Sequence, residues 1–354
     1  MAKRLICEQV TARGIPESMK ITQADDAWHP LKNRNYVEWW YFDLTNKDGS
    51  LLRGQFFLAG DLSHPRKVKT GIRASLVKPD LTEVLIERRF PYSAFKASKE
   101  TCDVQLGKSF IRGNLSHYDV HIEDGGQELD LAFDSAMTGF KGRACFGDER
   151  TYMMWVVPQP RSHVRGAYKT KDGTLDIDGV AYRDHNWSNM APMGCICYWD
   201  WGRVYDKEFT FIFADIFTTK RFGNARVKPL IVYDSSKMIW LSMEDDKWSL
   251  TKGDVRFDPH TELNCPQTTV LRARDGDFSL DMDLRLEKAF QKIDLLADFD
   301  PLPRFLIRTF VADPFIVSFL SSGSGKLALS GKEHALSCTA IHEHVNNLRG
   351  QRLA

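Results

Sequence analysis

The stretch EWWYFDLTNKDGSLLRGQFFLAG, residues 38–60, decides the fold class. Aromatic and aliphatic residues fill both of its ends, and Asn46-Lys47-Asp48-Gly49 interrupts them in the middle. Aromatic side chains favour strands, and an Asp-Gly pair between two apolar runs is typical of a hairpin turn. The stretch therefore predicts a strand, a tight turn and a second strand.

A second stretch, YWDWGRVYDKEFTFIFADIF at residues 198–217, repeats this plan. The segments before residue 190 and before the C-terminus also resemble each other. Their matching positions are Gly173, Leu175, Gly179, Ala181, Asp184 and His185 in the first, and Gly325, Leu327, Gly331, Ala340, Glu343 and His344 in the second. Self-similarity of this kind indicates two copies of one β-unit, with a boundary near residues 190–194.

Most other segments are short, rich in aromatic or β-branched residues and bounded by Gly, Asp or Asn, as strands are. EKAFQKIDLL, residues 287–296, is the best helical candidate. Each copy has the size of a small up-and-down barrel, which can enclose one small ligand. We predict an all-β protein of two tandem antiparallel β-barrels, with domains at residues 1–192 and 193–354.

Composition excludes several classes of function. The chain has 48 basic and 47 acidic residues and a net charge of +1, which gives no electrostatic case for a nucleic-acid partner. We see no signal peptide and no apolar run of about 18 residues that would span a membrane; residues 304–320 leave open only a peripheral membrane contact. Seven cysteines without a disulfide-framework pattern fit a reducing compartment, so we expect a cytoplasmic protein. The oligomeric state is not readable from the sequence.

The stretch AYRDHNWSN, residues 181–189, carries an acid, a base, an amide and an indole in a row. Residues alternate between the faces of a strand, so His185 shares a face with Trp187, and Tyr198 shares one with Asp200. If the strands that carry these pairs are neighbours, a base, an acid, a phenol and an indole surround one point.

Such a set suits proton chemistry on an apolar substrate. Loss of hydration among aromatic rings raises the pKa of a carboxyl group, so Asp200 is expected to stay protonated and to protonate an alkene. Aromatic faces stabilise the resulting cation, and a neutral His185 then takes a proton from water or from carbon. This chemistry needs no metal and no organic cofactor.

Other interpretations of the same residues are purely structural. Asp184 can pair with Arg183 or satisfy turn amides, and the tryptophans can be core residues. Glu38 lies beside two indoles in the sequence. Its carboxylate either forms an ion pair with an arginine or lies in a pocket. His342 and His344 share a face and form a metal site only if His185 converges on them, and we predict no metal.

The motifs EWWYFDL, GVAYRDHNWS and YWDWG resemble those of the carotenoid 1,2-hydratase (hydroxyneurosporene synthase) and AttH-type superfamily. The resemblance spans residues 30–345. It implies two lipocalin-like barrels and cofactor-free chemistry on hydrophobic substrates, such as the addition of water to an isoprenoid double bond. Kievitone hydratase is similar, and fungal lipocalin-like Diels–Alderases are more distant. Ser188 replaces the glycine that usually ends the Asp-His-x-Trp motif.

By this resemblance the functional residues are His185, Trp187, Tyr198 and Asp200. We expect Asp200 to be the general acid and His185 the base. Tyr198 stabilises the cation together with Trp187, and Asp184 either orients His185 or braces its strand. We expect substrate contacts from Glu38, Trp39, Trp40, Trp187 and Trp199.

The predicted partner is a hydrophobic small molecule, an isoprenoid, terpenoid or polyene, which the enzyme hydrates or cyclises. Two alternatives stay open. One is a pericyclase of the Diels–Alderase type, in which the shape of the pocket does the work. The other is a non-catalytic carrier of a hydrophobic ligand.

Overall fold

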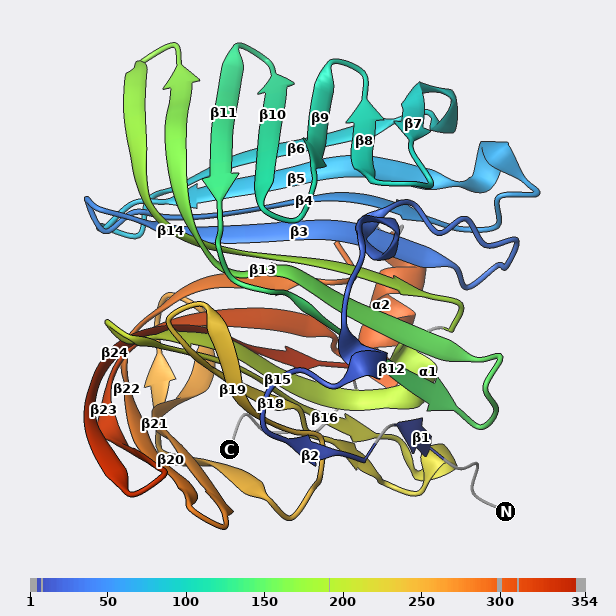
Figure 1. The fold of residues 1–354 in the computed structure, drawn as a ribbon. Coiled ribbons are helices and arrows are strands. Elements are labelled where there is room, and N and C mark those ends of the chain that lie inside the picture. Colours follow the sequence, from blue (N-terminus) through green and yellow to red (C-terminus); the bar gives the residue numbers. More distant parts are fainter. Residues whose placement is uncertain (1–4, 8, 191, 298–300, 311, 348–354) are drawn as a thin grey trace. The chain divides into compact units, whose positions relative to one another are not determined.

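The computed structural model describes residues 5–7, 9–190, 192–297, 301–310 and 312–347. Its regular secondary structure is almost entirely β-strand, and the chain divides into two compact units (Figure 1). We call Ile15–Ala191 the N-terminal unit, and Pro192–Ala354 together with Met1–Gly14 the C-terminal unit. The predicted all-β class is confirmed. The assignment of Met1–Gly14 differs from the expected boundaries, because β2 adds to the edge of the C-terminal sheet beside β19.

The N-terminal unit is built on one antiparallel sheet with the strand order β6-β5-β4-β3-β14-β13-β11-β10-β9-β8-β7, and β12 pairs with β13. Its strands are β3 (Val37–Asn46), β4 (Leu51–Ala59), β5 (Lys69–Val77), β6 (Glu83–Phe90), β7 (Phe95–Ala97), β8 (Cys102–Leu106), β9 (Ser109–Gly113), β10 (His117–Asp124), β11 (Gln127–Asp134), β12 (Phe140–Phe146), β13 (Tyr152–Thr170) and β14 (Gly173–Ser188). Its 3-10 turns are η1 (Glu17–Met19), η2 (Gln23–Asp26), η3 (Pro65–Lys67) and η4 (Tyr92–Ala94).

The C-terminal unit is built on a second antiparallel sheet with the order β2-β19-β18-β16-β15-β24-β23-β22-β21-β20, and β17 pairs with β16. Its elements are β1 (Leu5–Cys7), β2 (Thr11–Ala12), α1 (Pro192–Cys195), β15 (Ile196–Tyr205), β16 (Phe209–Thr218), η5 (Lys220–Phe222), β17 (Arg226–Val227), β18 (Leu230–Asp234), β19 (Lys237–Ser242), β20 (Trp248–Asp258), β21 (Leu263–Asp275), β22 (Phe278–Asp294), α2 (Pro301–Phe310), β23 (Phe315–Leu329) and β24 (Lys332–Asn346).

Each sheet wraps around a main apolar core, and the C-terminal unit has a smaller second cluster around Phe319. In the N-terminal unit, Ile86 on β6 and Phe95 on β7 belong to the same core cluster, although their strands lie at opposite ends of the ladder order. In the C-terminal unit, Trp240 on β19, next to one end of the order, and Trp248 on β20, at the other end, likewise share one core cluster. Alternate residues of each strand point into this core, so the interior receives every second side chain.

The internal repeat predicted from the sequence is visible in the strand pairing. In both units the first long strand pairs with the last strand of the unit, β3 with β14 and β15 with β24. His185 lies opposite Trp40 in the first pair, and His344 lies opposite Asp200 in the second. The two matched histidines therefore occupy equivalent places in the two sheets.

The helical expectation for residues 287–296 was wrong. This segment continues β22 as far as Asp294, because Ala289, Gln291 and their neighbours pair with β23. The longest helix in the described residues is α2. No helix in the described part of the chain combines the length and apolar character needed to cross a membrane.

Candidate functional site

The N-terminal unit buries a set of ionisable side chains around His185. We call this set the His185 cluster: Asp26, His29, Glu38, Arg183 and His185. Strand alternation brings Arg183 and His185 from β14 to the inner face, where Glu38 arrives from the neighbouring β3. Asp26 ends the turn η2, and His29 follows it in the loop that leads to β3.

His185 lies between two carboxylates. Its Nε2 is 2.8 Å from Oε1 of Glu38, and its Nδ1 is 3.4 Å from Oδ1 of Asp26. All three side chains are almost completely buried. Burial alone would lower the pKa of His185, but the hydrogen bonds and charges of Asp26 and Glu38 outweigh it and raise that pKa. The arrangement favours an imidazolium, contrary to the neutral base expected from the sequence.

Aromatic rings surround this imidazole. The ring of Trp40 stacks on His185 with centroids 4.5 Å apart, and the ring of Trp187 lies 5.0 Å away. His29 in turn stacks on Trp187 at 3.6 Å. Indole faces attract cations, so these rings favour a positive charge on His185 and on a reacting molecule beside it.

The second carboxylate, that of Asp26, also forms an ion pair with the buried guanidinium of Arg183. Arg183 Nη1 lies 3.8 Å from Oδ2 of Asp26, and the guanidinium carbon lies 3.6 Å from the ring centre of Tyr118. The hydroxyl of Tyr118 donates a hydrogen bond to Asp26. Burial would raise the pKa of Asp26, but Arg183 and His185 outweigh it and lower that pKa, so Asp26 is held as a carboxylate.

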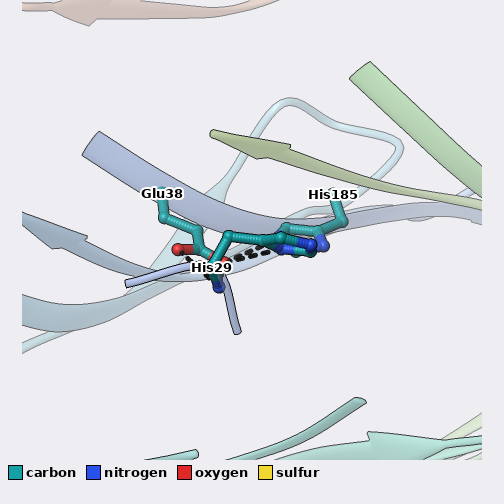
Figure 2. A group of neighbouring side chains, drawn as sticks. All are labelled: His29, Glu38 and His185. Carbon is teal, nitrogen blue, oxygen red and sulfur yellow. Dashed lines mark hydrogen bonds and ion pairs between the residues drawn. The ribbon is translucent and has the colours of Figure 1, made fainter. Parts of the chain in front are cut away.

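Glu38 is paired with a histidine, and neither of the two roles considered for it from the sequence describes it fully. Besides His185, it accepts hydrogen bonds from the Tyr36 hydroxyl and from the backbone N–H of His29. Burial opposes its ionisation, yet these donors lower the pKa of Glu38. Figure 2 shows Glu38, His29 and His185 converging from three segments of the chain.

Asp184 lies on the opposite face of β14 from His185. It accepts hydrogen bonds from Tyr182, Asn186 and Trp155. The contact with Trp155 ties β14 to β13, in agreement with the bracing role and not with the orientation of His185. Trp39 is likewise on the face of β3 opposite to Trp40, and only Trp40 contacts His185.

The C-terminal unit holds a separate polar group around Asp200. The carboxylate of Asp200 is 2.6 Å from Nζ of Lys252 on β20 and 2.9 Å from Nδ1 of His344 on β24. The ring of Tyr198 is 5.8 Å from that of His344. Trp199 lies on the other face of β15 and is only half-buried.

The expected rise in the pKa of Asp200 was wrong. Burial does favour the neutral acid, but the ammonium of Lys252 and the ring of His344 outweigh it and hold the pKa well below its usual range. Asp200 is therefore an ionised partner of Lys252 near neutral pH and has no proton to donate. His342, which bonds to Ser321 at 2.9 Å, has its pKa lowered to about 4 by burial.

The two predicted strands are not neighbours in a sheet. β14 pairs with β3 and β13, whereas β15 pairs with β16 and β24. The structure thus groups His185 with Trp187, Trp40 and Glu38 in one unit, and Tyr198 with Asp200 in the other. The histidine triad considered as a metal site divides in the same way, because His342 and His344 belong to the C-terminal unit.

Sequence reasoning missed Asp26, His29 and Lys252. Asp26 is signalled only indirectly, by the capping box that Thr22 and Asp25 form at the start of η2. His29 belongs to a loop, and Lys252 to a strand whose alternating pattern does not tell which residue it faces. These contacts are tertiary, and no local spacing encodes them.

Two sheets of this kind, each wrapped around a core with buried ionisable residues beside aromatic rings, define a lipocalin-like protein. The chain belongs to the Svf1 family, whose model matches residues 80–345. A curated relative, hydroxyneurosporene dehydrogenase of Chlorobaculum tepidum, is 23% identical over 232 residues, or 54% of this chain. The chain spans 59% of the length of that relative.

Three solved structures are similar along nearly the whole chain. CghA, solved with Sch210972, has a TM-score of 0.64 and 14% identity and covers 96% of this chain and 99% of its own. A putative AttH from Nitrosomonas europaea has a TM-score of 0.62, 14% identity and coverages of 95% and 99%. Kievitone hydratase from Nectria haematococca has a TM-score of 0.56, 15% identity and coverages of 94% and 97%. The expected kinship with the AttH-type superfamily and the lipocalin-like fold are confirmed.

Proposed function

We propose that the chain is a cofactor-free acid–base enzyme that protonates an alkene of a hydrophobic isoprenoid, terpenoid or polyene substrate. Water addition or cyclisation follows the protonation. The observation that carries this proposal is the buried His185, paired with Glu38 and stacked against Trp40. A lipocalin-like fold shared with kievitone hydratase agrees with it.

The roles that we propose are the reverse of those expected from the sequence. His185 holds the proton, because Asp26 and Glu38 raise its pKa. It gives that proton to one alkene carbon, and the cation left on the other carbon is stabilised by the indoles of Trp40 and Trp187. Water then attacks the cation and returns a proton to His185; in a cyclisation, the proton comes back from carbon.

The substrate reaches His185 from the side of His29. The side chain of His29 is 27% exposed, whereas those of His185 and Glu38 are 0% exposed. Displacement of His29 from its stack on Trp187 brings an apolar molecule against the indole and beside the imidazolium. We also propose a cytoplasmic location, on the cysteine argument given above.

The test is incubation of metal-stripped protein with prenylated phenols and polyenes in heavy-oxygen water, followed by mass spectrometry. The proposal expects a product that gains one labelled water, or an isomer of unchanged mass, and loss of either product in His185→Gln. An isomer that still forms in His185→Gln identifies a pericyclase. Binding of unchanged ligand without product identifies a carrier and refutes the catalytic assignment.

A further inference from the structure

His29, Glu38 and His185 offer two imidazoles and a carboxylate to one point in the N-terminal unit (Figure 2). One ligand atom from each lies within 4.8 Å of the others. Two histidines and a glutamate are a ligand set that zinc takes in proteins, with an open fourth position for water. The residue types therefore match a transition metal, and the question is whether geometry and charge do too.

The separations of the ligand atoms suit a tetrahedral ion. Oε1 of Glu38 is 2.8 Å from Nε2 of His185 and 3.7 Å from Nδ1 of His29. Bonds of about 2.0–2.1 Å at tetrahedral angles place ligand atoms roughly 3.4 Å apart. These two separations bracket this value, and all three ligand atoms lie within 4.8 Å of one another. Side-chain shifts on the order of 1 Å at His29 and Glu38 therefore complete the site.

The surroundings of the three ligands are those of a metal centre. Nδ1 of His29 is buried and makes no hydrogen bond, so it is available to a cation. Nδ1 of His185 faces Asp26 at 3.4 Å, and a carboxylate behind a ligating histidine fixes its ring and strengthens it as a ligand. The Tyr36 hydroxyl and the His29 backbone N–H hold Glu38 in place.

The balance of buried charges also favours a bound cation. A metal-ligating His185 is neutral, so in that state the guanidinium of Arg183 compensates only one of the two buried carboxylates, Asp26 and Glu38. A buried negative charge is costly unless a cation is paired with it. A divalent ion between Glu38 and the two imidazoles supplies that charge directly.

We infer that His29, Glu38 and His185 bind a divalent transition metal of the zinc class, with water as the fourth ligand. The inference goes beyond the proposed function, since a metal on Nε2 of His185 occupies the atom that holds the proton. In the metal-bound protein, His185 has no proton to give, so the proposed reaction does not occur. The metal-free protein is the state that catalyses it.

A second histidine–carboxylate group provides the internal control. His121, Glu128 and Asp130 also lie within ligand distance of one another, on the hairpin β10–β11. Lys169 already approaches Glu128 at 3.4 Å and Asp130 at 3.6 Å, so an ammonium occupies the place of a cation there. We expect that group to bind no metal.

The test is titration of metal-stripped protein with Zn²⁺ by calorimetry, and with Co²⁺ by visible absorption. Wild type is expected to bind one equivalent, with the intense absorption of four-coordinate Co²⁺. His29→Gln is expected to lower the affinity by more than about 100-fold, while His121→Gln leaves it unchanged. His29 is the most exposed of the three ligands, so His29→Gln is the variant that best retains the fold, and circular dichroism verifies this.

Absence of binding to wild type overturns the inference. Binding that survives His29→Gln and disappears in His121→Gln also overturns it, because the metal then sits on the hairpin. The Zn²⁺ and Co²⁺ titrations need no substrate. A failure of the metal inference is therefore distinguishable from a failure of the proposed enzyme activity.

Discussion

Nε2 of His185 and Oε1 of Glu38 lie 2.8 Å apart, with neither side chain exposed to solvent. Such a pair is stable only while both charges are present, since each would be costly to bury alone. The proton that joins them is therefore structural and, under the proposed function, also the proton that the substrate receives. The first two predictions separate these two uses of it.

Glu38→Gln is expected to lower the free energy of unfolding by about 3–5 kcal/mol, because it removes one partner of a fully buried ion pair. Urea denaturation measures this loss. Glu333→Gln is the matched control, since Glu333 pairs with Lys326 at the surface and such pairs contribute little. Equal stability of the two variants would mean that His185 is neutral in the folded protein.

His185→Gln is expected to lower turnover by about 10²–10⁴-fold, the usual contribution of a general acid. Asp200→Asn is expected to leave most of the turnover, because Asp200 is already ionised beside Lys252 and donates no proton. Single-turnover rates on the substrate found by the labelling screen measure both effects. The opposite ranking would restore Asp200 as the acid.

The N-terminal unit is expected to lose stability as pH rises. The pKa of His185 is raised by Asp26 and Glu38, so its contribution is complete below its ordinary value of 6.5 and disappears as pH rises through the folded value. Urea denaturation of wild type and His185→Gln between pH 5 and pH 9 measures it. The advantage of wild type is expected to shrink towards alkaline pH, and a constant difference would contradict the assignment.

The C-terminal unit is expected to respond in the opposite direction. Burial lowers the pKa of His342 from 6.5 to about 4, so its contribution is complete above 6.5 and is lost as pH falls towards 4. A shift of this size corresponds to about 3 kcal/mol. Wild type is expected to lose more stability than His342→Gln between pH 6.5 and pH 4; parallel curves would show that His342 stays accessible to water.

Gly202→Ala is expected to destabilise the C-terminal unit by about 1–3 kcal/mol through overpacking. A methyl group there would lie 2.4 Å from the Phe213 ring and 2.9 Å from Cβ of His342. Gly194→Ala is the control, because a methyl group at Gly194 meets nothing within 4 Å. Thermal denaturation of both variants measures the effect, and equal melting temperatures would show that the strands around Gly202 yield easily.

Much of the fold was predictable because it depends on local signals. Strand alternation correctly placed His185 beside Trp187 and on the face opposite to Asp184, and the turn residues correctly placed the hairpin of β3 and β4. The repeat predicted which histidines correspond. The helix predicted for residues 287–296 was wrong. The apolar spacing of this segment fits a helix, but pairing with the neighbouring strand holds most of it in an extended conformation.

The candidate site was less predictable because its energetics depend on contacts between distant segments. Whether Asp200 is protonated depends on Lys252, which lies five strands further along the sheet order and is invisible to local pattern. Whether His185 is charged depends on Asp26, from a 3-10 turn. An aromatic neighbourhood raises the pKa of a carboxyl group only when no cation reaches it.

The equivalence of His185 and His344 has a consequence for their proton affinities. The two histidines lie at the same crossing of equivalent strand pairs, opposite Trp40 in one unit and opposite Asp200 in the other. The pKa of His185 is raised because Asp26 and Glu38 outweigh its burial, whereas the pKa of His344 is lowered because burial outweighs Asp200. One repeated architecture thus holds two histidines of opposite proton affinity, and the charged residues around each ring decide the direction.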